Sequence, residues 1–64
     1  MQPRFNPDDQ VYACMPDGTK KVGTVVEVNK LGNKWRYVVQ FFDGEDAAVG
    51  VFIDSDLEGY DTHR

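Results

Sequence analysis

The segment Trp35–Gly44, WRYVVQFFDG, constrains the fold of this chain more than any other. It is an aromatic and β-branched run that stops at Asp43-Gly44, and such a dipeptide after such a run is a strong hairpin signal. Asp17-Gly18 and Leu31-Gly32-Asn33 are two further turn signals at strand spacing. Short strands divided by tight turns predict an all-β fold, a small antiparallel barrel.

The residue pattern predicts strands over 10–15, 21–29, 34–42 and 46–52. Val25, Val26 and Val28 break strict alternation in the second of these, which indicates either a β-bulge or a strongly bent strand with both faces partly buried. Gly23 fits a bulge or a close backbone approach. The acidic segment 53–58 favours a single 3₁₀ or helical turn. A brief fifth strand is expected over 59–61.

Strand 34–42 alternates on both faces, so the pattern does not decide which face is buried. One face would carry Trp35, Tyr37 and Phe41, and the other would carry Arg36 and Phe42. The sequence therefore leaves open whether Phe41 or Phe42 is available at the surface.

The length of 64 residues allows one domain, which we place at 10–61, with an N-terminal arm at 1–9 and a frayed C-terminus at 62–64. A domain this small has a marginal core. The single cysteine, Cys14, excludes an internal disulfide, so stability depends on packing. We expect a monomer or a weak homodimer.

Charge is distributed unevenly along the chain. Residues 19–40 contain five basic and one acidic side chain, a balance of +4, whereas residues 41–61 contain seven acidic and no basic ones, a balance of −7. The overall charge of −4 is not typical of a nucleic-acid binder. The asymmetry nevertheless predicts a basic and an acidic region on the surface.

The residues offer little for catalysis or for metal binding. The single histidine, His63, lies next to the C-terminus, so no Ser/His/Asp or Cys/His arrangement and no zinc site is indicated. We expect no enzyme activity and no cofactor. Neither a membrane span nor an apolar signal-peptide core is present in the sequence, which predicts a cytoplasmic or nuclear protein that is not secreted.

The order of strands, tight hairpins, 3₁₀ turn and closing strand resembles an SH3-like barrel, and within that class a Tudor domain. The resemblance rests on short motifs between Phe5 and Glu58: DQVYA at 9–13, DG at 17–18, GTV at 23–25, YVVQFFDG at 37–44 and DSDL at 54–57. It implies a five-stranded antiparallel barrel with a 3₁₀ turn before the last strand.

Many Tudor domains bind methylated lysine or arginine in an aromatic cage. In this sequence the four cage positions fall at Met15, at Lys20 or Lys21, at Phe41 and within 44–47. Phe41 alone supplies a ring. The resemblance therefore implies a Tudor-like barrel without a working methyl-lysine cage.

These observations predict a small non-catalytic interaction module that binds a protein partner through the surface of its second to fourth strands. The candidate partner-binding residues are Trp35, Tyr37, Phe41, Phe42 and Asp43. The alternative is nucleic-acid or acidic-partner binding by the basic residues around two hairpins, which are Lys20, Lys21, Lys30, Lys34 and Arg36.

Two further resemblances point to other functions. The segments VGTV at 22–25 and YVVQF at 37–41 are similar to the SH3-like small subunit of photosystem I that helps dock ferredoxin. The plasmid-type dihydrofolate reductase, a tetrameric enzyme, is built on the same barrel, but its pore motif is not found in this sequence.

Overall fold

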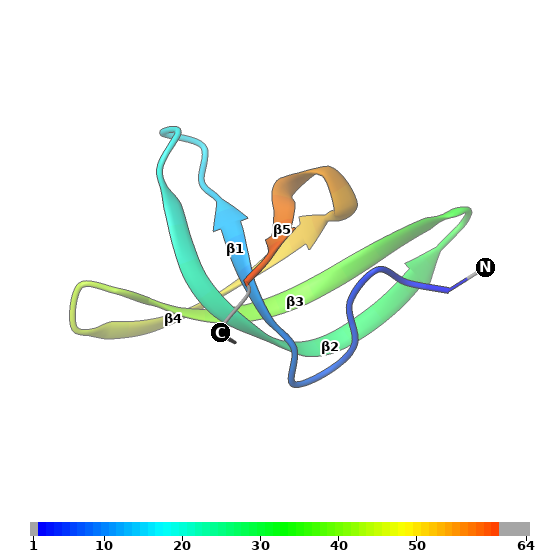
Figure 1. Cartoon of the computed structure of the whole chain (residues 1–64), viewed down its shortest axis with the longest axis horizontal. Coiled ribbons are helices and arrows are strands. Elements are labelled where there is room, and N and C mark those ends of the chain that lie inside the picture. The colour runs from blue at the N-terminus through cyan, green and yellow to red at the C-terminus, as the bar shows by residue number, and fades with distance from the viewer. Residues whose placement is uncertain (1, 61–64) are drawn as a thin grey trace.

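The computed structural model describes residues 2–60 as one strongly bent antiparallel β-sheet (Figure 1). Five strands and one 3₁₀ turn follow each other along the described chain. They are β1 (Gln10–Cys14), β2 (Lys20–Leu31), β3 (Lys34–Asp43), β4 (Asp46–Ile53), η1 (Asp54–Asp56) and β5 (Leu57–Gly59). This confirms the all-β class, the antiparallel pairing and the 3₁₀ turn before the last strand.

The spatial order of the strands is β4-β3-β2-β1-β5. Within residues 2–60 no hydrogen-bonded ladder joins β4 to β5, so the sheet stays open and the expected barrel is not confirmed. The long strand β2 is the middle strand of the sheet, and it curves down the left and along the lower side of the view in Figure 1. It pairs with β1 at its start and with β3 along most of its length.

The three tight turns follow from glycines at the predicted turn positions. Gly18, Gly32 and Gly44 have φ angles of +90°, +66° and +68°, a region that other residues rarely adopt. Asp17 stabilises the first turn because its Oδ1 accepts bonds from the backbone N–H and the hydroxyl of Thr19, which also lowers the pKa of Asp17. The tight turn at Gly32 lets β2 run to Leu31, beyond the predicted end.

A β-bulge bends β2 where the valine pattern predicts one. The register with β3 shifts between Val25 and Glu27, which confirms the prediction. Gly23 packs directly against β3, since a Cβ atom there would lie 2.6 Å from Cγ1 of Val39 and 2.8 Å from the carbonyl oxygen of Gln40. The glycine therefore permits β2 and β3 to approach closely.

The core lies on the concave face of the sheet. Side chains from all five strands and from the N-terminal arm fill it, namely Phe5, Val11, Ala13, Val25, Tyr37, Val39, Phe41, Phe52 and Leu57. Two aromatic contacts are edge-to-face, between Phe5 and Tyr37 and between Phe41 and Phe52. Phe41 is buried and Phe42 is exposed. The face of β3 that packs on the core is therefore the one that carries Tyr37 and Phe41.

The N-terminal arm is part of the fold. Phe5 is buried, and the arm joins β2 at the bulge, where Asp8 N–H donates to the Val25 carbonyl at 2.7 Å and Val25 N–H donates to the Asp9 carbonyl at 2.8 Å. The Val25 backbone faces the arm because Asp9 and Val25 continue the alternation of the β1–β2 ladder, in which Ala13 is paired with Lys21 and Val11 with Gly23. Residues 5–9 therefore stabilise the sheet.

The last strand begins earlier than predicted. β5 spans Leu57–Gly59 because Leu57 enters the core directly after η1 and pairs with Ala13 of β1. The predicted strand over 59–61 is wrong at its start, and Asp61 lies outside the described residues, as does the tail at 62–64.

We predict that Tyr37→Phe lowers the free energy of unfolding by about 1 kcal/mol, because the hydroxyl accepts a 3.0 Å hydrogen bond from the Arg4 N–H. Burial, together with the neighbouring Asp54 carboxylate, raises the pKa of Tyr37. The Tyr37 hydroxyl therefore loses its proton at a lower pH in the unfolded chain than in the folded chain. The contribution of Tyr37 to the free energy of unfolding is fully present below pH ~10 and is lost as the pH rises through the pKa of the folded state. In urea titrations between pH 8 and 11, the free energy of unfolding should fall less steeply with pH for Tyr37→Phe than for wild type. The same fall with pH in both proteins would contradict this prediction.

Candidate apolar surface on the outer β3–β4 face

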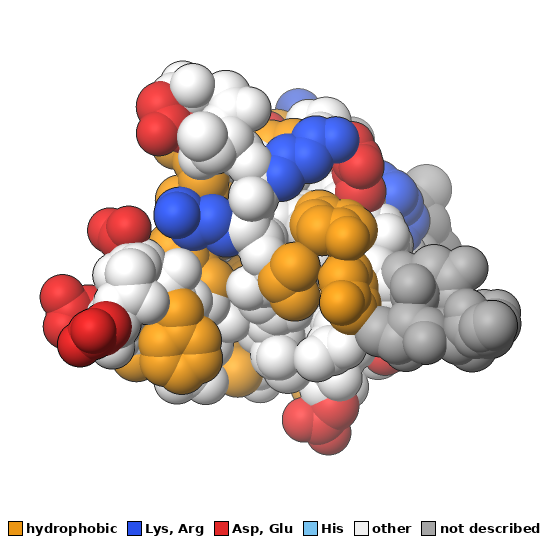
Figure 2. Space-filling model, turned by 60° about the vertical axis from the view of Figure 1, so that its left-hand side comes forward, with side chains coloured by type: hydrophobic (Ala, Val, Ile, Leu, Met, Phe, Trp, Pro, Cys, Tyr) orange, Lys and Arg blue, Asp and Glu red, His pale blue; other side chains and the backbone are white. Residues whose placement is uncertain are grey.

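The convex side of β3 and β4 carries a group of apolar side chains, all exposed except the half-buried Val38. The register pairs Phe42 with Ala47, Gln40 with Val49, Val38 with Val51 and Arg36 with Ile53, so these residues share the face opposite the core. We call this surface the outer β3–β4 face and define it by its apolar members Val38, Phe42, Ala47, Val49, Val51 and Ile53. In the space-filling view, hydrophobic side chains reach the surface next to charged ones (Figure 2).

Exposure is high for several of these side chains. Phe42 is 66% exposed, Val49 is 62% exposed and Val51 is 61% exposed. Single exposed apolar residues are ordinary, but a contiguous group on one sheet face is typical of an interaction surface.

Opposite charges flank the outer β3–β4 face at its two ends. The β3–β4 hairpin carries the exposed acids Asp43, Glu45 and Asp46, and the β2–β3 hairpin carries the exposed bases Lys30, Lys34 and Arg36. Figure 1 shows these two hairpins at opposite ends of β3. The face is therefore apolar in its middle, acidic at one end and basic at the other.

The structure separates the five predicted partner-binding residues. Tyr37 and Phe41 lie in the core, with 0% and 7% exposure, and Trp35 is half-buried beside them on the same face of β3. Phe42 and Asp43 are exposed. Asp43 Oδ1 lies 3.7 Å from Lys21 Nζ, a weak surface contact.

The structure does not bring the five predicted basic residues together. Lys20 and Lys21 stand at the start of β2, whereas Lys30, Lys34 and Arg36 lie around the opposite hairpin (Figure 1). Lys20 Nζ is 2.9 Å from Glu58 Oε2, and this partner raises the pKa of Lys20. Lys30 Nζ lies 5.5 Å from the centroid of the Trp35 ring. The sequence spacing therefore does not produce one basic patch.

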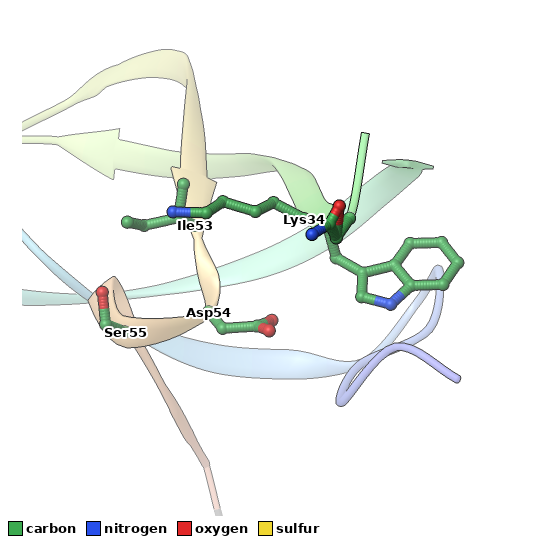
Figure 3. Close-up of a pocket in the computed structure, with 6 residues that line it drawn as sticks. Lys34, Ile53, Asp54 and Ser55 are labelled. Carbon is green, nitrogen blue, oxygen red and sulfur yellow. The ribbon is translucent and has the colours of Figure 1, made fainter. Parts of the chain in front are cut away.

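A shallow pocket of about 230 Å³ lies where β3 begins and β4 ends. Its lining includes Lys34, Trp35 and Asp54, and Figure 3 shows the Lys34 side chain extending toward Ile53. Within residues 2–60 neither Trp35 Nε1 nor Asp54 Oδ1 has a hydrogen-bond partner, although both atoms are buried. Both atoms are almost inaccessible to solvent, so the pocket does not present them to a ligand, and its lining residues include no nucleophile paired with a base.

Neither a metal-binding cluster nor a membrane-spanning helix is seen in the described part of the chain. Residues 2–60 contain no group of three or more His, Cys, Asp or Glu side chains placed to hold a metal ion. In the same residues no helix has the length and apolar character needed to span a membrane. His63 lies outside the described residues.

Sequence reasoning did not select the apolar residues of β4. The sequence places Val49 and Val51 only as members of the strand at 46–52, whose pattern does not say which face packs on the core, and it places Ile53 in the acidic turn at 53–58. The one available signal was the small size of Ala48 and Gly50 on the opposite face, where the Phe52 ring lies within 3.1 Å of where a Gly50 Cβ would stand.

Comparison with known proteins found no matching family model, no similar curated protein and no similar solved structure.

Proposed function

We propose that this chain is a non-catalytic interaction module that binds a protein partner through the outer β3–β4 face. The observation that carries the proposal is the exposed Phe42 side chain within a continuous apolar face. Large aromatic residues in apolar surroundings are typical anchors of protein interfaces. The acidic and basic ends of the face supply charges that orient a partner.

A protein partner is favoured over nucleic acid. Phosphate-driven binding needs a basic patch, and here the basic residues are divided between two ends of β2, with Lys20 held by Glu58. The middle of the outer face offers apolar contact instead.

We also propose that the sheet belongs to the SH3-like class, as a Tudor-like variant without the aromatic cage. The order of strands, hairpins and 3₁₀ turn supports this placement. Phe41, the one aromatic residue at a cage position, packs against Phe52 in the core, which argues against methyl-lysine binding.

The experiment is affinity capture from a lysate of cells that express the chain, with and without nuclease. Wild type is compared with Phe42→Ser and with Leu31→Ser, a matched control because Leu31 is 62% exposed on the far hairpin. We expect a protein that survives nuclease, is lost with Phe42→Ser and is retained with Leu31→Ser. Recovery that disappears with nuclease would instead support nucleic-acid binding.

A further inference from the structure

Strand β4 is an open edge of the sheet without the usual protection against pairing. Among residues 2–60 it pairs only with β3, on one side, over eight residues in unbroken register. Its sequence, DAAVGVFI, contains no lysine, arginine or proline, and its one charge is at the first residue, Asp46. Natural edge strands are usually shortened, bulged or charged so that they do not pair with another chain.

The other edge of the sheet is protected. β5 has only three residues, and its central residue Glu58 is paired with Lys20. The difference between the two edges of one small sheet points to a specific occupant for β4.

We infer that the occupant of the β4 edge is a second copy of this chain, paired antiparallel about a two-fold axis at Val49. In this register Ala47 lies opposite Val51 of the second copy, and Val49 lies opposite its own equivalent. Because paired residues share a face, Val49 and Val51 of the two copies form one continuous apolar strip. Counted over the described part of each chain, the joined sheet has ten strands, and the short β5 strands form its two edges.

Charge complementarity selects the antiparallel arrangement. It places the β3–β4 hairpin of one copy, with its exposed Glu45, beside the Ile53 end of β4 in the other copy, and Ile53 is paired with Arg36 on β3. The acidic hairpin of each copy therefore lies at the basic end of the other copy, with one strand between the hairpin and Arg36. Lys34, which extends toward Ile53, stands at the same end (Figure 3). A parallel arrangement would bring acidic tip to acidic tip.

This inference goes beyond the proposed function, because it concerns the edge of β4 and leaves the outer face open. Phe42 lies on β3, one strand away from the edge, and remains exposed in the dimer. An isologous contact at one edge per copy closes at two copies, so the assembly is a dimer and not a fibre. Eight-residue strands bury little area, which places the contact among weak interfaces.

The first test is sedimentation equilibrium of the purified chain over a range of concentrations up to about 1 mM, the weak end of specific association. We expect a reversible monomer–dimer equilibrium. Val49→Lys places two ammonium groups opposite each other and should weaken it at least tenfold. Leu31→Ser, at the same 62% exposure but away from β4 and without a change of charge at the basic end, should leave it unchanged. A monomer at every concentration, or equal losses in both variants, would overturn the inference.

The second test reverses the charges at the two ends. Glu45→Lys and Arg36→Glu should each weaken the dimer. The double variant should restore it, because a lysine at 45 then faces a glutamate at 36 of the second copy. All three variants change exposed residues, so folding should be retained. Absence of rescue, or growth beyond a dimer, would contradict the antiparallel register. A monomer that still captures a partner through Phe42 would leave the proposed function standing.

Discussion

Phe41→Ala is expected to lower the free energy of unfolding by about 3–5 kcal/mol, whereas Phe42→Ala should change it by less than about 0.5 kcal/mol. The residues are neighbours in sequence, but Phe41 is 7% exposed and packs edge-to-face on Phe52, while Phe42 is 66% exposed. Truncation of Phe41 leaves a cavity in the core, and truncation of Phe42 removes only surface area.

Urea denaturation followed by circular dichroism measures both values. A domain of this size has a total stability of roughly 3–10 kcal/mol, so Phe41→Ala is expected to be largely unfolded at the lower end of that range. Phe41→Leu, with an expected cost of about 1–2 kcal/mol, keeps the comparison measurable in that case. Similar losses for the alanine variants at both positions would contradict the assignment of faces.

Gly23→Ala is expected to cost about 2–3 kcal/mol, the second-largest effect. The added methyl group would stand 2.6 Å from Cγ1 of Val39 and 2.8 Å from a backbone oxygen, so β2 and β3 must move apart. Val39 belongs to the core, and such a shift loosens packing on both sides of it.

The matched control for this substitution is Gly59→Ala. Nothing lies within 4 Å of a Cβ at Gly59, and its backbone does not adopt the left-handed region. We expect no loss of stability at this position in the same thermal or urea experiment. If Gly23→Ala were as stable as Gly59→Ala, the close contact between β2 and β3 would be wrong.

The sequence predicted the turns, the bulge and the 3₁₀ turn, because the backbone conformation of each depends on a few neighbouring residues. The glycines at 18, 32 and 44 take the positive φ angles that the turn signals require. Clustered valines predicted the bulge between Val25 and Glu27, and the acidic segment predicted the 3₁₀ turn at Asp54–Asp56. Each of these features depends on residues adjacent in sequence.

Features that depend on contacts between distant residues were not predictable in the same way. The arm gave no sign that Phe5 would pack on Tyr37, which lies far away in sequence. β3 is rich in apolar residues on both faces, so alternation alone did not separate Phe41 from Phe42. Closure of the barrel requires the two edge strands to meet, and no local motif encodes the distance between β4 and β5.

The candidate site also has a part that the sequence predicted and a part that depends on contacts between strands. Phe42 and Asp43 were predicted and are exposed, but the apolar residues of β4 that complete the face were recognised only from the register with β3. The basic residues are close together in the sequence, but β2 separates them into two groups, because the two ends of a twelve-residue strand lie far apart.

The most direct test of the proposed interaction surface is a calorimetric titration of the captured partner protein into wild type, Phe42→Ser and Leu31→Ser. The account predicts that Phe42→Ser weakens Kd at least about tenfold, that Leu31→Ser leaves it within about twofold, and that raising the salt concentration has only a small effect. Unchanged affinity for Phe42→Ser, or an equal loss for Leu31→Ser, would contradict a binding surface on the outer β3–β4 face.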